Sequence, residues 1–269
     1  MLTQLEAVGC YIAGHTENLC PADKKLDALR DVTGTVASLP LIVASIMSKK
    51  LAESLDRLVL DVKFGRGAFM QKREDAQKLA DAMVAVGRGA GVETLALLNP
   101  MDQPLGCAAG NALEVAECVE VLKGGGPQDL IDLTLDLAAK LVPAPREKLR
   151  ARLSNGTAWQ KFVAMVEAQG GDATTVEKMR EIHRAPVMTE IAAPAAGKLC
   201  KLDALEIGRL CVELGAGRAK AGDAVEFAIG VECLKKEGDA VDQGEPILRV
   251  HSRTPIDAAA PFGRIASVA

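Results

Sequence analysis

Aromatic side chains are scarce in this chain, which has one Trp, one Tyr and five Phe. That is too few for the stacking platforms on which proteins bind single-stranded nucleic acid. The net charge of −4 and the pI of about 5.6 provide no overall basic field for a phosphate backbone. We therefore expect no nucleic-acid partner.

Long apolar runs are also missing. The longest, residues 39–47, contains Pro40 and Ser45 and is far shorter than a membrane-spanning helix. Residues 1–14 have no cationic start and carry Glu6, which argues against a secretory signal. We expect a cytoplasmic protein without membrane contact.

Cysteines and histidines do not cluster. The seven cysteines are Cys10, Cys20, Cys107, Cys118, Cys200, Cys211 and Cys233, and the three histidines are His15, His183 and His251. An odd count without a C-x-x-C pair argues against both a disulfide framework and a zinc site. The pattern is typical of a reducing compartment.

What is present is enough apolar material for a large core. The chain has 269 residues, 49% hydrophobic and 25% charged, with a mean hydropathy of +0.13. These values exclude a disordered or collagen-like chain. The length suits one α/β domain and a smaller second domain.

Periodicity predicts a strand–helix–strand unit near the middle of the chain. Residues 58–62 and 94–98 read as buried strands, and residues 73–86 form an amphipathic helix between them. Such a unit makes a right-handed parallel crossover. Functional loops are then expected at the carboxyl ends of the strands, over 63–70 and 99–107.

The flanking regions are expected to be helical first and β-rich later. Residues 8–13 read as a strand or turn, and further helices are predicted over 22–30, 38–55, 111–123 (capped by Asn111), 128–141, 146–153 and 158–168. After residue 185, short strands at 187–191 and 197–200 flank a helix. Asp203 and Glu206 have capping-box spacing at its start, and Gly215 closes it.

A hydroxyl and an ammonium share one face of the helix predicted over 38–55. Ser45 and Lys49 are four residues apart, among Leu41, Ile42 and Ile46. A planar ligand with carbonyl groups and an N–H could pair with them. A solvated lysine beside a packing serine is the commoner explanation of such spacing.

Residues 99–117 join a proline–glycine loop to a helix that carries Glu114 and Glu117. Loop carbonyls with one carboxylate suit a hard cation. The alternative is an ordinary surface helix with acidic residues near its N-terminus.

Two glycine-containing stretches carry weaker signals. The loop at 63–69 follows a strand, where its glycines would let a ligand approach the backbone. The segment EGDAVDQGEPILRV resembles the closing hairpin of a lipoyl-type carrier. Asp242 and Gln243 stand at its tip, where a modifiable lysine would be needed, so a structural role is favoured.

The string ALRDVTGTVASLPLIVASIMSKKLA at 28–52, with PADKKL before it and LVLDVKFGRGAFM after it, resembles the thymidine and pyrimidine-nucleoside phosphorylases. The similarity continues through PLGCAAGNALEVAE, AQGGD, LGAGRAKAGD and GDAVDQGEPILRVHS. The resemblance implies an α/β fold: a large domain with a parallel or mixed sheet and a β-rich C-terminal part, plus part of a small helical domain.

The resemblance also implies a base-binding site. Arg30, Ser45 and Lys49 would hold the pyrimidine ring, and Val36, Ile42, Phe69 and Met70 would line the pocket. A potassium ion would be bound through Leu105, Ala108 and Glu117. No organic cofactor is implied, and phosphate would be the co-substrate.

The implied reaction is phosphorolysis of thymidine or uridine to the free base and (2-deoxy)ribose 1-phosphate, in a homodimer. The family's K-H-S motif, with its histidine, and its phosphate loop precede this region and are not among these residues, so no catalytic residue is assigned. The alternative is a truncated, inactive chain that binds a base or a partner copy.

The implied layout has four segments. Residues 1–20 are a strand and linker, 21–55 part of a helical domain, 56–184 the α/β core and 185–269 an α+β subdomain.

Overall fold

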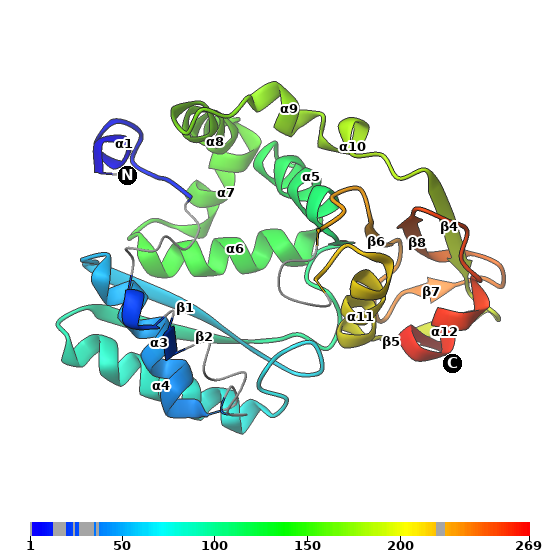
Figure 1. Ribbon diagram of the computed structural model, residues 1–269, viewed down its shortest axis with the longest axis horizontal. Coiled ribbons are helices and arrows are strands. Elements are labelled where there is room, and N and C mark those ends of the chain that lie inside the picture. Colours follow the sequence, from blue (N-terminus) through cyan, green and yellow to red (C-terminus); the bar gives the residue numbers. More distant parts are fainter. Residues whose placement is uncertain (1, 13–19, 24, 27–34, 36–37, 219–223) are drawn as a thin grey trace. The chain divides into compact units, whose positions relative to one another are not determined.

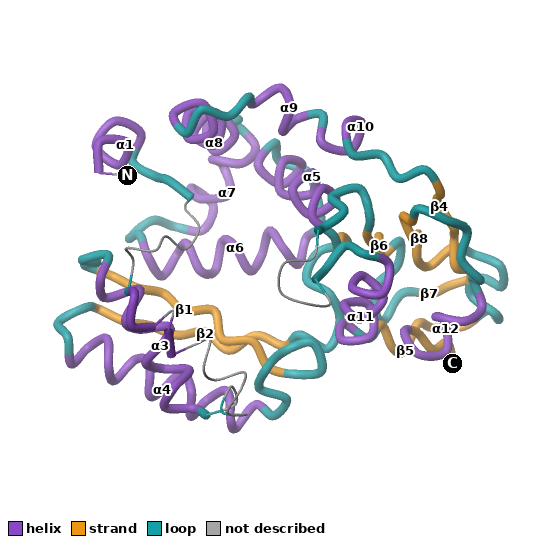
Figure 2. Tube along the Cα trace, in the orientation of Figure 1, coloured by secondary structure: helices purple, strands orange, loops and turns teal. Residues whose placement is uncertain are grey.

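The computed structural model describes residues 2–12, 20–23, 25–26, 35, 38–218 and 224–269. These residues pack as two compact units (Figures 1 and 2). Unit 1 comprises Met1–Tyr11, Met101–Leu135 and Arg146–Ala269, and unit 2 comprises Ile12–Pro100 and Asp136–Pro145. Among the described helices, none combines the length and the apolar character that crossing a membrane requires.

Unit 2 contains the predicted crossover. Strands β1 (Arg57–Phe64) and β2 (Glu93–Pro100) pair in parallel, with α4 (Arg73–Gly89) between them in sequence. Helix α3 (Leu39–Ala52) packs against α4. The buried core of this unit is Val43, Met47, Leu58, Val62, Ala76, Leu79, Ala80, Met83 and Val92. The sequence prediction of strand, helix and strand is confirmed.

A close approach between α4 and β2 fixes how the helix lies on the strands. A Cβ placed on Gly87 would overlap the Oγ1 atom of Thr94. Thr94 is fully buried, and its hydroxyl donates to the carbonyl of Val92 at 3.0 Å. The absence of a side chain at residue 87 therefore allows the last turn of α4 to contact β2 directly.

Helix α3 begins after Ser38, as predicted, but Ser38 makes no side-chain cap hydrogen bond. Pro40 stands in the first turn, where a missing N–H costs nothing. The helix ends at Ala52 rather than near residue 55. Of the helix predicted over 22–30, residues 22–23 and 25–26 are helical and the others lie outside the described residues.

The helical part of unit 1 closely follows the prediction. Its helices are α5 (Asn111–Leu122), α6 (Gln128–Leu141, whose residues from Asp136 belong to unit 2), α7 (Arg146–Ser154), α8 (Thr157–Ala168), α9 (Ala173–Glu177) and α10 (Met179–Ile182). The prediction that Asn111 caps α5 is wrong. Gly110 is the N-cap, and the Asn111 side chain instead donates to the Ala216 carbonyl at 3.0 Å.

The β-rich part of unit 1 has two antiparallel sheets. One has the order β3 (Ala108–Ala109), β6 (Gly230–Cys233), β8 (Pro246–Ser252) and β4 (Val187–Ala192); the other has β7 (Ala240–Val241), β5 (Gly197–Leu202) and β9 (Ala266–Val268). Helices α11 (Ala204–Leu214) and α12 (Ala259–Ile265) accompany them. Leu199, Leu202, Ile207, Val231 and Leu248 are central to the buried core.

Asp203 caps α11 as predicted, by accepting from the N–H groups of Leu205 and Glu206. The reciprocal half of a capping box is absent, because the Asp203 N–H donates to the Ile265 carbonyl at 2.7 Å. The Glu206 carboxylate instead pairs with Arg209. The prediction of a full capping box is therefore wrong.

The N-terminal strand expected within residues 1–20 is wrong for the described residues of that range, because Leu2–Val8 form helix α1 and residues 9–12 are in no strand. Leu5 and Val8 recur at a spacing of three, which suits a helix better than a strand. The strand had been predicted from the apolar run over 8–13. The fold class itself, a mixed α/β chain with parallel and antiparallel sheets, is confirmed. The four predicted segments remain a prediction.

Candidate functional site

Helix α3 brings Ser45 and Lys49 together. They are one turn apart on the same face, and Lys49 Nζ lies 3.0 Å from Ser45 Oγ. The ammonium donates to the hydroxyl, so the hydroxyl proton remains available to an acceptor elsewhere. The pair is therefore prepared to offer two hydrogen-bond donors to one ligand.

Asp23 holds the Lys49 ammonium from the other side, at 2.9 Å from Oδ2. The lysine side chain is 20% exposed and the aspartate side chain 11%. Charges this poorly solvated require a partner, and the carboxylate fixes where the ammonium sits. The sequence prediction missed Asp23, although Asp23 is part of the PADKKL string that precedes residue 28.

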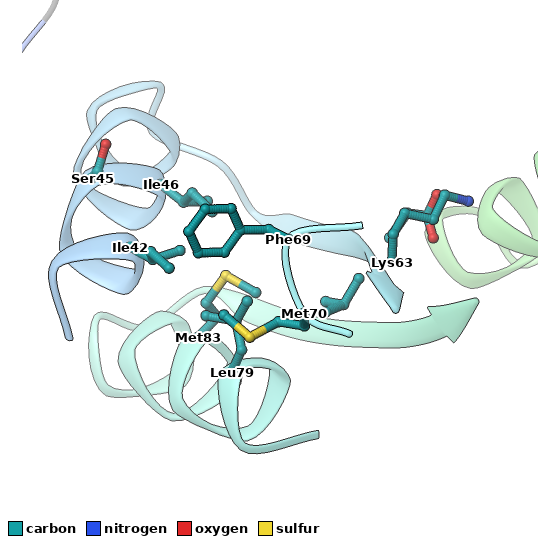
Figure 3. A pocket seen from close by; sticks show the side chains of 10 residues that line it. Ile42, Ser45, Ile46, Lys63, Phe69, Met70, Leu79 and Met83 are labelled. Carbon is teal, nitrogen blue, oxygen red and sulfur yellow. The ribbon is translucent and has the colours of Figure 1, made fainter. Parts of the chain in front are cut away.

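A hollow of about 390 Å³ opens beside Ser45 in unit 2. In Figure 3 the ring of Phe69 faces Ile42 and Ile46, with Met70 and Met83 beyond it. Phe69 is 59% exposed, so much of its apolar ring is accessible from solvent. The walls are apolar and polar groups are few, as in a small-molecule site.

The predicted pocket residues fall into two groups. Ile42, Phe69 and Met70 line the hollow, together with Ser45. Lys49 is not among the lining residues and reaches the hollow through Ser45. Arg30 and Val36 lie outside the described residues. The roles of all of them remain predictions.

A polar group stands where β1 and β2 end, away from the apolar part of the hollow (Figure 3). Lys63 Nζ lies 2.7 Å from Asp61 Oδ2, and Asn99 Nδ2 donates to Asp61 Oδ1 at 2.7 Å. Register places Lys63 opposite Asn99. The sequence placed functional loops at these strand ends but singled out neither Asp61 nor Lys63.

The three predicted potassium ligands lie in one part of unit 1. Glu117 on α5 is buried, and its Oε1 accepts from the Cys107 N–H at 2.8 Å, between Leu105 and Ala108 in sequence. The alternative of a solvated surface helix is therefore wrong for Glu117. Glu114, by contrast, is exposed and accepts from the Gly110 N–H.

Ala108 has a carbonyl that points out of its sheet ladder. It pairs antiparallel with Glu232, and the neighbouring Cys233 N–H donates to the Cys107 carbonyl at 2.7 Å. Since such pairs alternate, Ala108 is at a position whose backbone groups face away from β6. Its carbonyl oxygen is therefore oriented away from the partner strand.

Charged groups of both signs surround the Glu117 carboxylate. Burial raises the pKa of Glu117, and the nearby Asp129 and Glu120 add to the rise, while the Cys107 N–H and Lys236 oppose it. Carbonyl oxygens beside a buried carboxylate fit a hard cation.

Comparison with known proteins places these features in a family. Residues 1–158 match the model described as the a/b domain of the glycosyl transferase family, and residues 199–266 match the pyrimidine nucleoside phosphorylase C-terminal domain. The chain belongs to this glycosyl transferase family. The resemblance to pyrimidine-nucleoside phosphorylases is confirmed as well.

Several curated relatives are named pyrimidine-nucleoside phosphorylase. The chain is 46% identical to a pyrimidine-nucleoside phosphorylase of Bacillus subtilis over 250 residues, and 45% identical to those of Staphylococcus haemolyticus and Staphylococcus aureus. Each alignment covers 90% of this chain and 58% of the relative. The chain thus spans less than two thirds of the length of these relatives.

Proposed function

We propose that this chain takes part in phosphorolysis of a pyrimidine nucleoside. Thymidine or uridine and phosphate would give the free base and (2-deoxy)ribose 1-phosphate, a pentosyl transfer that needs no organic cofactor. The observation that carries the proposal is the Lys49 ammonium held 3.0 Å from Ser45 Oγ, with Ser45 lining the apolar hollow. The names of the relatives favour an enzyme over the inactive binding module.

The chemistry explains why cationic donors belong at this place. When the bond between C1′ and N1 breaks, the sugar becomes positive and the departing base gains negative charge on N1, O2 and O4. A donor aimed at those oxygens stabilises the transition state more than the ground state. In our proposal Lys49 and Arg30 supply the positive charge, and Ser45 pairs with the ring N3–H or a carbonyl.

The apolar walls complete the proposed base site. A flat ring would lie against Phe69, with Ile42, Met70 and Val36 around it. The hollow of about 390 Å³ is within the range of small-ligand pockets. Exclusion of water by these side chains strengthens each charged hydrogen bond to the ring.

Potassium is the second part of the proposal. The carbonyls of Leu105 and Ala108 and the carboxylate of Glu117 would hold the ion. Support comes from the buried carboxylate and from the outward orientation of the Ala108 carbonyl. Formation of a homodimer and a cytoplasmic location remain predictions.

The test compares two neighbouring lysines. Lys50 pairs with Glu53 on the exposed side of α3, so Lys50→Met is a matched control for Lys49→Met. We expect the wild-type chain and the Lys50→Met variant to bind uracil or thymine in calorimetric titrations. The Lys49→Met variant should bind at least about tenfold more weakly.

Turnover is then measured as phosphate-dependent release of base from uridine and thymidine. Release by the wild-type chain, reduced in Lys49→Met, supports the full proposal. Base binding without release supports the binding-module alternative. If the wild-type chain binds neither base, the assignment of the hollow is overturned.

A further inference from the structure

A lysine from the C-terminal part of unit 1 reaches into the loop that carries the proposed potassium ligands. Lys236 Nζ donates to the Gly106 carbonyl at 2.6 Å and to the Pro104 carbonyl, and lies 3.0 Å from Asp129 Oδ2. Its side chain is 22% exposed. The carbonyls of two residues that are two positions apart, together with one carboxylate, thus surround the ammonium.

We infer that the Lys236 ammonium is a built-in monovalent cation that holds the loop over 104–108 in its folded shape. Lys236 is therefore a positioning residue for the backbone of this loop. The contacts of Lys236 do not depend on the proposed function. The consequence that they also position the Leu105 and Ala108 carbonyls for potassium rests on the proposed function.

The loop has further ties to the same turn. The Cys233 N–H donates to the Cys107 carbonyl at 2.7 Å, and the Glu237 N–H donates to Gln103 Oε1 at 3.1 Å. Residues 233–237 therefore contact residues 103–107 at several successive points. Among these contacts, that of Lys236 brings a full charge to the loop.

Charge explains why an ammonium suits this position. Asp129 Oδ2 accepts from the Gly106 N–H at 3.2 Å as well as facing Lys236. Carbonyl oxygens that converge repel one another and attract a compact cation. Removal of the Lys236 charge would leave these oxygens with a carboxylate beside them and no cation.

Lys235 offers a matched control on the same turn. Its ammonium pairs with Glu245 at 2.6 Å, and among the described residues its side chain makes no hydrogen bond or ion pair with the 104–108 loop. Loss of Lys235 removes a charge of the same sign one residue away. A general effect of charge on the turn would therefore appear in both variants.

The experiment is hydrogen exchange of the whole chain, followed at the amides of Gly106 and Cys107. These amides donate to Asp129 and Glu117 and should be protected in the wild type. We expect Lys236→Met to exchange them about tenfold faster and Lys235→Met to leave them unchanged. Ammonium chloride should restore protection in Lys236→Met, whereas tetramethylammonium chloride, which cannot donate, should not.

Three results would overturn the inference. One is that the amides of Gly106 and Cys107 are as protected in Lys236→Met as in the wild type. Another is that both lysine variants lose protection of these amides to the same extent. The third is a loss of amide protection in Lys236→Met that ammonium chloride does not reverse. Base titration of the same variants separates this test from the proposed function, since rescue by ammonium stands even where no base binds.

A measurement on the wild-type chain covers the case in which Lys236→Met does not fold. A lysine ammonium donating to three oxygens exchanges its protons slowly. Nitrogen-detected spectra should therefore show a protected ammonium signal for Lys236, while the signal of Lys235, identified by its loss in Lys235→Met, exchanges faster. Equal exchange of the two signals would contradict the inference.

Discussion

The Glu117 carboxylate occupies the space that a side chain at Gly106 would need. A Cβ on Gly106 would overlap Glu117 Oε2, while Glu117 Oε1 is held by the Cys107 N–H at 2.8 Å. The carboxylate is buried, so it cannot simply turn into solvent. Gly106 also has a φ of +67°, which only glycine adopts without strain.

The first prediction is that Gly106→Ala destabilises unit 1 by two separable effects. Left-handed strain costs about 1 kcal/mol, and displacement of Glu117 from Cys107 should cost about 1–2 kcal/mol more. Gly156→Ala is the matched control, because Gly156 has a φ of +77° and nothing near its Cβ position. Denaturant unfolding of both variants measures the difference. Equal losses would show that Glu117 moves aside at no cost.

A second prediction concerns Glu232, whose pKa falls to about 2 chiefly because His251 donates to it, with help from Arg180. A carboxylate with a lowered folded pKa stabilises the protein above its unfolded pKa of about 4.5. That contribution is lost as the pH falls from about 4.5 toward about 2. Glu232→Gln should therefore cost up to about 3 kcal/mol at pH 7.

The difference between Glu232→Gln and wild type should shrink through that acid range and vanish near its lower end. Urea unfolding at a series of pH values measures it. Glu190→Gln is the control, since Glu190 is 46% exposed and pairs with Arg249 at 2.9 Å. It should cost less than about 1 kcal/mol. A pH-independent loss in Glu232→Gln would contradict the linkage.

The third prediction tests the contact between α4 and β2. Gly87→Ala would press a methyl group into Thr94, and the overpacked interface should lose about 1–3 kcal/mol. Gly89→Ala, two residues later with open space around it, should be neutral or slightly stabilising. Thermal unfolding distinguishes them. A Gly87→Ala variant as stable as Gly89→Ala would show that the helix shifts freely on the strand.

Sequence patterns predicted the regular elements well because burial sets their periodicity. The run at 58–62 and the helix at 73–86 appear as β1 and α4, each slightly longer. Element ends were predicted less well, since they depend on tertiary partners. Asn111 donates to Ala216, about a hundred residues away, and the Asp203 N–H donates to Ile265. Local spacing contains no information about such partners.

The candidate site was predictable from sequence only through the family string. Spacing alone placed Ser45 and Lys49 on one face but favoured a solvated lysine. The partner that buries the lysine, Asp23, lies 26 residues earlier. Likewise Lys236 lies 130 residues from Gly106. Contacts over such distances arise from the fold and leave no local pattern in the sequence.

The fourth prediction separates the two partners of Lys49. Asp23→Asn keeps a hydrogen-bond acceptor but removes the charge that fixes the ammonium, so the lysine should become mobile. We expect affinity for uracil or thymine to fall, though by less than in Lys49→Met, because the cation itself remains. Glu53→Gln, which removes the partner of Lys50 at 3.1 Å, should leave affinity unchanged. Titration calorimetry at low and high salt measures this order. Tighter base binding in Asp23→Asn would mean that the aspartate competes with the base for Lys49 and does not position it.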